Sequence, residues 1–138
     1  MALSCLLDTS VITRLGVDVV RAGVEELATS HALLARASIT DLEVGFSARN
    51  AGEFDTLTGA LEAFERIEIE PPHFRRAQQM QRQLADRGLR GRKVPDLLIA
   101  AAAEALGMTV VHYDSDFEHI STVTGQPVRW IVAAGSIN

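Results

Sequence analysis

The sequence has 138 residues, of which 47% are hydrophobic and 22% are charged, and its formal net charge is −5. These values are ordinary for one globular domain over residues 1–138, and they exclude an intrinsically disordered chain. The single cysteine cannot form an internal disulfide, which fits a cytoplasmic protein. The longest apolar run, near residues 97–111, is broken by Glu104 and is too short to span a bilayer, so no contact with a membrane is expected.

Short apolar runs alternate with longer helical patterns along the chain. Strands are predicted at residues 3–7, 34–39, 67–69, 108–113 and 128–132. Helices are predicted at residues 10–16, 20–29, 41–50, 53–65, 72–87, 95–106 and 115–120. Helix starts are indicated by Thr40, by the Pro71-Pro72 pair and by Pro95, while Gly107 is placed like a helix C-cap. This alternation predicts a three-layer α/β/α fold around a central, mostly parallel sheet of about five strands.

Acidic residues stand at several of the predicted junctions between strands and helices. Asp8 ends the first strand, and Asp114 and Asp116 follow the fourth. Glu43 lies in the first turn of the predicted helix 41–50, and Asp96 opens the predicted helix 95–106. Because ligands of parallel sheets bind outside the carboxyl ends of the strands, we expect these carboxylates to meet at one edge of the sheet.

Each acidic residue also has a purely structural explanation. Asp8 is placed to cap the helix that follows it, and the spacing of Thr40 and Glu43 matches a capping box. Asp96 is placed to complement a helix dipole, and either Asp114 or Asp116 is placed to cap the short helix after the fourth strand. Helix capping explains each residue singly, but it does not explain why all of them map to the same edge.

A shared location of these carboxylates indicates a cation site. Several carboxylates close together repel one another, and this repulsion raises some of their pKa values unless cations neutralise them. Oxygen ligands suit Mg²⁺ or Mn²⁺, and the sequence has no Cys/His pair at the spacing of a zinc site. Because Mg²⁺ commonly shares its coordination shell with substrate phosphates, a site of this kind suggests phosphodiester chemistry.

Four segments together carry a resemblance to a known family. The segments "LLDTSVI" and "PDLLIAAAAEALG", the final "VVHYDSDFEHI" and the acidic Glu43 stand in an order and spacing similar to those of PIN-domain ribonucleases. The match is closest to the VapC toxins of type II VapBC toxin–antitoxin systems, and it covers nearly the whole chain as one PIN domain. The resemblance implies an Mg²⁺-dependent endoribonuclease that cuts tRNA or rRNA and stops translation. It also implies a homodimer and a cognate VapB-type antitoxin.

The resemblance also implies roles for individual residues. Asp8, Glu43 and Asp96 match the first three metal-binding and catalytic acidic residues of the family. Asp114 and Asp116 both qualify as the fourth, and the sequence does not decide between them. The family further has a small hydroxyl residue that helps to hold the acidic cluster, matched here by either Thr9 or Ser10.

A basic segment precedes Asp96. Seven of the thirteen basic residues lie in it: Arg75, Arg76, Arg82, Arg87, Arg90, Arg92 and Lys93. We expect its last part to contact RNA phosphates, through Arg87, Arg90, Arg92 and Lys93. The alternative is a solvated helix face followed by a polar loop. Because aromatic residues make up 5% of the chain, recognition by RNA shape is favoured over extensive base stacking.

Two other classes of protein remain as alternatives. A phosphoryl-transfer α/β protein also uses aspartates at a sheet edge, although Ser10 stands where an aspartyl-phosphate hydrolase has its second Asp. A non-catalytic PIN-like domain that only binds RNA or protein is the other. Phe46, Phe54 and Phe64 recur along consecutive predicted helices, which indicates either core packing or a dimer face.

Overall fold

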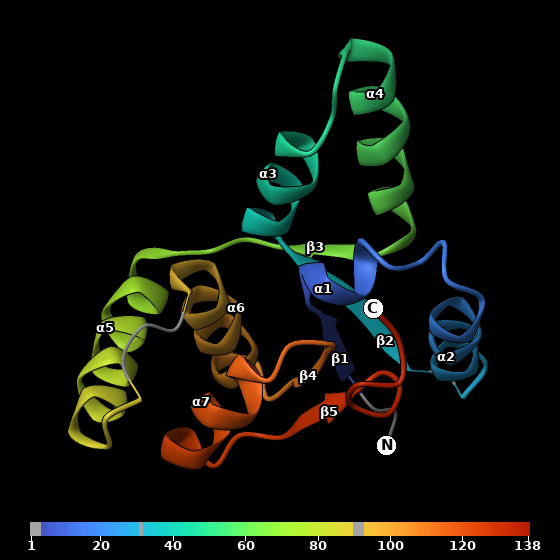
Figure 1. The fold of residues 1–138 in the computed structure, drawn as a ribbon. Coiled ribbons are helices and arrows are strands. Elements are labelled where there is room, and N and C mark those ends of the chain that lie inside the picture. Colours follow the sequence, from blue (N-terminus) through green and yellow to red (C-terminus); the bar gives the residue numbers. More distant parts are fainter. Residues whose placement is uncertain (1–3, 31, 90–92) are drawn as a thin grey trace.

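A computed structural model describes residues 4–30, 32–89 and 93–138 of the chain (Figure 1). Its sheet consists of β1 (Ser4–Leu7), β2 (Leu33–Ala37), β3 (Glu65–Ile67), β4 (Thr109–His112) and β5 (Val128–Trp130). The strand order is β3-β2-β1-β4-β5, and every pair of neighbours is parallel. The predicted parallel sheet of about five strands is therefore confirmed.

The described helices cover both faces of this sheet. They are α1 (Thr9–Ile12), α2 (Asp18–Thr29), α3 (Ser38–Phe46), α4 (Ala51–Ala60), α5 (Pro71–Asp86), α6 (Val94–Ala105) and α7 (Asp116–Thr124), with a 3-10 helix, η1 (Leu61–Ala63). Figure 1 shows α5, α6 and α7 on one side of the sheet and α2 on the other. The predicted α/β/α layering is confirmed, although the first helix is shorter than expected and the last is longer.

Alternation along the central strands produces the two cores. In β1, Leu6 packs with residues of α5, α6 and α7, whereas Cys5 and Leu7 pack with α1 and α2. Val110 and Val111 of β4 divide between the same two cores. Successive side chains of a strand point to opposite faces, so strands buried on both sides are apolar at every position. This is why the central strands read as continuous apolar runs.

Two of the predicted helix signals are confirmed by the backbone. Pro71 begins α5, whose N-terminus carries reciprocal hydrogen bonds between Glu70 and His73. Gly107 follows α6 with a φ of 66°, which residues other than glycine rarely adopt. The amide of Met108 donates to the carbonyl of Ala103 at 2.9 Å, so the last turn of α6 closes as a Schellman motif.

The predicted helix start at Thr40 is wrong. Strand β2 passes directly into α3 at Ser38, with Ala37 as an N-cap that makes no side-chain hydrogen bond. Thr40 therefore lies inside the helix and does not form a capping box with Glu43. Its buried hydroxyl instead pairs with the hydroxyl of Thr9 at 2.9 Å.

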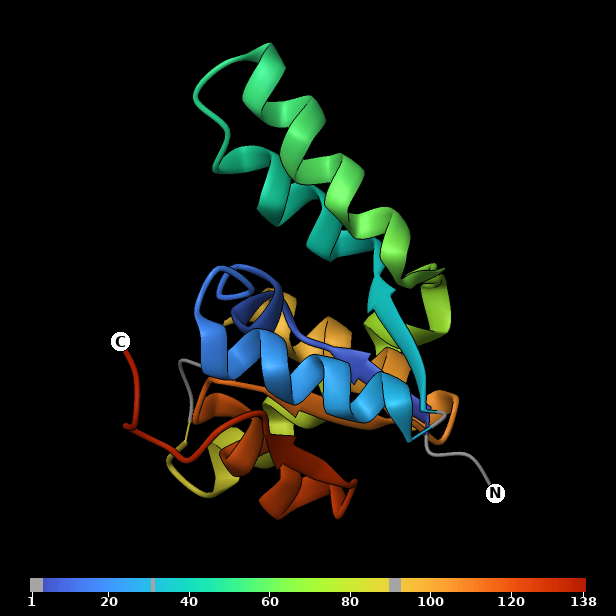
Figure 2. The ribbon, with the colours of Figure 1, turned by 90° about the vertical axis from the view of Figure 1, so that its right-hand side faces the viewer.

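Helices α3 and α4 form a hairpin that projects from the body of the protein (Figure 2). The two helices approach closely at Gly45, where an added Cβ would lie 2.7 Å from the Phe54 ring. Of the two alternatives for Phe46, core packing is wrong, because its side chain is 92% exposed. Phe64 is buried but precedes β3 instead of lying in a helix. The exposed hairpin therefore leaves apolar surface open to a partner.

A buried ion pair fixes the base of this hairpin. Arg36 of β2 donates to both carboxylate oxygens of Asp41 in α3, at 2.8 and 3.1 Å. The same guanidinium donates to the carbonyls of Leu61 and Phe64, which follow α4. Arg36 is 5% exposed, so its charge depends on these partners. One side chain thus joins β2, α3 and the chain segment that enters β3.

Within the described ranges, no helix has both the length and the hydropathy needed to cross a membrane.

Candidate metal-binding active site

The predicted acidic residues gather at the carboxyl ends of β1 and β4. A pocket of about 220 Å³ opens there beside the starts of α1 and α6 and the second turn of α3. Its lining consists of Asp8, Thr9, Ser10, Thr13, Arg14, Glu43, Lys93, Asp96, Tyr113 and Asp114. Four of the five acidic residues singled out in the sequence therefore share one pocket, and Asp116 adjoins it through Asp114.

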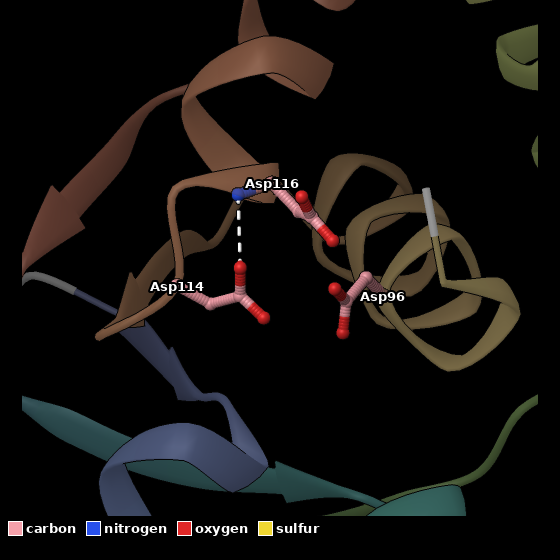
Figure 3. A group of neighbouring side chains, drawn as sticks. All are labelled: Asp96, Asp114 and Asp116. Atoms are coloured by element: carbon pink, nitrogen blue, oxygen red, sulfur yellow. Dashed lines mark hydrogen bonds between the residues drawn. The ribbon is translucent and has the colours of Figure 1, made fainter. Parts of the chain in front are cut away.

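Three carboxylates lie closest together. Asp96, Asp114 and Asp116 each offer an oxygen, and these oxygens all lie within 4.8 Å of one another. Figure 3 shows Asp96, in the first turn of α6, reaching toward Asp114 in the β4–α7 connection and Asp116 at the start of α7. The amide of Asp116 donates to Asp114 Oδ1 at 3.0 Å, which fixes the turn that holds both side chains. Two segments of the fold thus supply one group of ligand oxygens.

Asp8 performs the structural role expected of it and has one oxygen left over. Its Oδ2 accepts the amide of Ser10 at 3.0 Å and so caps α1. Its Oδ1 is buried and has no hydrogen-bond partner among the residues described, and the same holds for Oδ2 of Asp96. A buried carboxylate oxygen without a partner is costly. Capping explains one oxygen of Asp8 but not the other.

The pKa values of these carboxyls reflect burial and mutual repulsion. Burial raises the pKa of Asp8 to about 6, with a further rise from the charge of Glu43 and an opposing effect of the hydrogen bonds from Ser10. Burial, followed by the charges of Asp8 and Asp114, raises the pKa of Asp96 to about 8. The pocket therefore holds protons near neutral pH that a divalent cation would displace.

The pKa of Asp114 shifts in the opposite direction to those of Asp8 and Asp96, because Asp114 is hydrogen-bonded to a cation. Burial raises its pKa, but the amide of Asp116 and the ammonium of Lys93 outweigh burial, and the pKa is lowered overall. Lys93 Nζ lies 2.9 Å from Asp114 Oδ2, and this pairing raises the pKa of the lysine. Lys93 thus partly neutralises the pocket.

Hydroxyl groups fix the remaining side chains of the pocket. Thr9 donates to Glu43 Oε1 at 2.7 Å, so the proton shared between the two threonine hydroxyls must come from Thr40. The hydroxyl of Ser10 accepts the amide of Tyr113 at 2.8 Å. The sequence left the supporting hydroxyl open between Thr9 and Ser10; Thr9 contacts an acidic residue directly, whereas the Ser10 hydroxyl holds the amide next to Asp114. Their roles in metal binding, like those of the five acidic residues, stay predictions.

The basic segment divides into several environments. Arg76 pairs with Glu104, and Arg82 pairs with Asp86, as expected for a solvated helix face. Arg87 is exposed at the C-terminal end of α5 and does not line the pocket. The predicted RNA contacts Arg90 and Arg92 lie outside the described residues. Of the four predicted contacts, Lys93 is the one that the structure places at the acidic pocket.

Arg14 and Tyr113 line the pocket but were missed in the sequence. Tyr113 precedes Asp114 directly, and that adjacency was an available signal. Arg14 stands four residues after Ser10, so a helical turn brings it back beside the start of α1, and its Nη1 donates to the carbonyl of Ser10 at 2.8 Å. No local pattern marks Arg14, because its other side-chain contacts are with the distant residues Tyr113 and Asn138.

The donor set fits a hard divalent cation. The clustered ligands are carboxylate oxygens, and in the part of the chain that the structure describes Asp96 of this cluster and the neighbouring Asp8 each have a buried oxygen without a partner. Mg²⁺ and similar ions prefer such oxygens, whereas structural zinc sites use thiolates and imidazoles. A cation here would relieve both the repulsion and the unpaired oxygens.

Comparisons with known proteins agree with this geometry. A family model described as "PIN domain" matches residues 5–123. The chain is 59% identical to Ribonuclease VapC51 of Mycobacterium tuberculosis over 138 residues, which is 100% of both chains. It is 45% identical to Ribonuclease VapC21 of the same species over 133 residues, which covers 95% of this chain and 96% of the relative.

Solved structures with low sequence identity share the fold. VapBC2 from Rickettsia felis, bound to a promoter DNA fragment, contains a chain that matches with a TM-score of 0.78 at 18% identity, covering 93% of this chain and 98% of that one. FitAcB from Neisseria gonorrhoeae matches with a TM-score of 0.72 at 21% identity, covering 91% and 96%. The family match spans most of the sequence, and the full-length relatives agree with it. The chain belongs to the PIN-domain family, whose members use divalent metal ions.

Proposed function

We propose that this protein is the toxin of a toxin–antitoxin pair and that it hydrolyses phosphodiester bonds of RNA with the help of a divalent metal ion. The observation that carries this proposal is the convergence of Asp96, Asp114 and Asp116 within 4.8 Å, beside the buried Asp8. The names of the full-length relatives, ribonucleases of the VapC type, support the same activity.

The ion that we propose is Mg²⁺, with Mn²⁺ able to replace it, because the clustered ligands among the described residues are carboxylate oxygens. Asp8 and Asp96 would hold it through their unpaired oxygens, with Asp114 or Asp116 completing the ligand set. When bound, such an ion polarises a phosphate and lowers the pKa of a coordinated water.

Glu43 is the proposed residue that orients the attacking water. Its carboxylate lines the same pocket, and the hydroxyl of Thr9 fixes one of its oxygens at 2.7 Å, which leaves the other oxygen to accept a proton from water. Attack by water, instead of the ribose 2′-hydroxyl, leaves a 3′-hydroxyl and a 5′-phosphate. Sequencing of the 5′ ends after brief expression would identify both the product and the RNA that is cut.

The decisive experiment compares variants that keep the shape of the carboxylates. Asp8→Asn and Asp96→Asn proteins are assayed on cellular RNA with Mg²⁺ and with EDTA, beside Asp55→Asn, which changes an exposed carboxylate of α4. We expect cleavage by the Asp55 control alone, and only with Mg²⁺. Undiminished cleavage by either pocket variant, or cleavage in EDTA, would remove the proposed metal mechanism.

The proposed substrate is structured RNA, either tRNA or rRNA, in the cytoplasm. Five carboxylates around the pocket repel an RNA backbone, so cations near the rim are needed to hold it. Lys93 is in place at the pocket. We propose that the basic residues before it, Arg87, Arg90 and Arg92, contribute further phosphate contacts.

The proposed partner is a VapB-type antitoxin, because the solved structures that share the fold are toxin–antitoxin complexes. A groove of about 650 Å³ beneath the α3–α4 hairpin offers a place for it. The apolar residues that line the groove are Ile39, Leu42, Phe46, Phe54, Ile69, Phe74 and Leu98. An exposed apolar surface of this kind marks an interaction site, and an amphipathic antitoxin segment would bury it.

A matched pair of variants tests this partner. Phe46→Ser removes an aromatic ring that is 92% exposed in the groove, while Val19→Ser changes an exposed apolar residue of α2 outside it. The product of the adjacent reading frame is titrated against both. We expect loss of binding in the Phe46 variant alone, and equal binding by the two variants would exclude the groove. We also propose a homodimer, which light scattering of the purified toxin tests.

A further inference from the structure

We propose that Arg14 donates a hydrogen-bonding fork to a phosphate of the RNA backbone beside the acidic pocket. This inference rests on the proposed ribonuclease function and identifies a substrate contact for it. Among the residues that the structure describes, two cationic side chains line the pocket, Arg14 and Lys93. Their surroundings differ in a way that separates their roles.

Lys93 is already paired with a carboxylate of the pocket. Its Nζ lies 2.9 Å from Asp114 Oδ2, so its ammonium already forms an ion pair with a neighbouring carboxylate. Arg14 instead makes its two hydrogen bonds to main-chain oxygens: Nη1 donates to Ser10 at 2.8 Å, and Nε donates to Asn138 at 3.0 Å. Neither contact involves a carboxylate of the pocket, so Arg14 is oriented without being paired to Asp8, Glu43, Asp96 or Asp114. Arg14 therefore keeps N–H donors at the rim that the pocket's own carboxylates do not occupy.

The guanidinium of Arg14 is also held in advance. Its centre lies 5.1 Å from the centroid of the Tyr113 ring, a cation–π contact that adds to the two hydrogen bonds. The hydroxyl of Tyr113 donates to the carbonyl of Ile137 at 2.7 Å and accepts the amide of the same residue at 3.1 Å. The C-terminal segment thus fixes both Tyr113 and Arg14, and little side-chain entropy remains to be lost when a ligand binds.

The donors left over match a phosphate. With Nε and one N–H of Nη1 engaged, the remaining N–H groups, including both on Nη2, have no partner among residues 4–30, 32–89 and 93–138. Adjacent N–H groups on Nη1 and Nη2 bind two oxygens of one phosphate, a geometry that lysine cannot reproduce. A phosphate at this rim would gain a cation that the carboxylates of the pocket have not neutralised.

The test measures RNA binding without cleavage. Arg14→Gln and Arg21→Gln are each made in an Asp96→Asn background, and their affinities for fluorescently labelled, unfractionated bacterial transfer RNA are measured in Mg²⁺ over a series of salt concentrations. Arg21 is the matched control, because it lies on α2, pairs with Asp18 and does not line the pocket. We expect roughly tenfold weaker binding for the Arg14 variant alone. The slope of log affinity against log salt should fall by about 0.7 to 0.9, the value of one phosphate contact.

Two outcomes would overturn the proposal. The first is an Arg14→Gln protein whose affinity and salt slope equal those of the Arg21 control. The second is an Arg14→Lys protein with full affinity, which would exclude the two-pronged hydrogen bonding by the guanidinium. If the Arg14→Gln protein does not fold, the Arg14→Lys protein replaces it in the binding assay. Cleavage by the parent protein is measured separately. Absent cleavage with a normal Arg14 effect would count against the proposed ribonuclease, not against the phosphate contact.

Discussion

Asp96→Asn is expected to stabilise the metal-free protein while removing its activity. Burial and the neighbouring carboxylates raise the pKa of Asp96 from 3.8 to about 8 in the folded protein. Below pH 4 both the folded and the unfolded state hold the proton. As the pH rises from about 4 to about 8, the unfolded chain releases the proton first, so the carboxyl favours unfolding more and more. Asparagine keeps the shape and cannot ionise in either state.

The size of this effect follows from the two pKa values. At pH 7, about 1.4 kcal/mol for each pH unit above 3.8 gives an upper figure of roughly 4 kcal/mol of destabilisation by the wild-type carboxyl. The buried amide of asparagine lacks some hydrogen-bond partners, which costs about 1 to 3 kcal/mol. The expected net gain is therefore about 2 kcal/mol at pH 7, or a Tm higher by roughly 5 to 10 °C.

Thermal unfolding in EDTA, followed by circular dichroism at pH 5 and pH 7, checks this prediction. The gain should be present at pH 7 and nearly absent at pH 5, because most of the penalty builds up between these values. Asp55→Asn, which changes the net charge equally at an exposed position, should leave the Tm almost unchanged at both. A Tm at pH 7 that is equal to or below the wild-type value would refute the reasoning from burial and repulsion.

Three further outcomes are expected. Mn²⁺ should raise the Tm of the wild-type protein more at pH 8 than at pH 5.5. The pKa is raised to about 6 for Asp8 and to about 8 for Asp96, so the ion competes with protons at the lower pH. An equal Tm shift at both pH values would contradict this. Arg36→Leu should lower the free energy of unfolding in urea by about 2 kcal/mol, because the carbonyls of Leu61 and Phe64 lose a buried donor while Asp41 keeps only its second partner, Arg66; a loss below about 1 kcal/mol would count against the role of Arg36 at the base of the hairpin. Thr9→Val should lower the free energy of unfolding by about 1 kcal/mol and reduce cleavage at least tenfold, whereas Thr9→Ser should keep the stability and the cleavage rate of the wild-type protein. Wild-type cleavage by the valine variant would show that the hydroxyl does not position Glu43.

The sheet and its acidic edge could be predicted because both depend on short-range patterns. Apolar runs of strand length alternate with helical patterns, and parallel strands bring their carboxyl ends to one edge. This placed Asp8 and Asp114 correctly without any knowledge of the contacts between them. The start of α3 was missed because Ala37 makes no side-chain cap and the strand runs straight into the helix. Capping signals predict helix starts only where a side chain supplies the cap.

The remaining features depend on contacts between distant residues. Arg14 is held by Asn138, which is 124 positions away, and nothing near Arg14 in the sequence indicates that contact. The sequence left Phe46 open between core packing and a dimer face, because its exposure depends on the projection of the α3–α4 hairpin from the body of the protein. Burial of Arg36 was not predicted either, since its partners come from two other segments, Asp41 in α3 and the stretch from Leu61 to Phe64.

Helix α3 is shared by two surfaces of the molecule. Leu42 lines the apolar groove, and the next residue, Glu43, lines the acidic pocket. A single rigid helix of nine residues carries both, and the buried guanidinium at its base sets its orientation. An occupant of the groove that prefers one tilt of α3 changes the free energy of ion binding wherever that binding depends on the position of Glu43, and the ion then changes the occupant's affinity by the same factor. Calorimetric titration of one ligand in the presence of the other would measure this reciprocity directly.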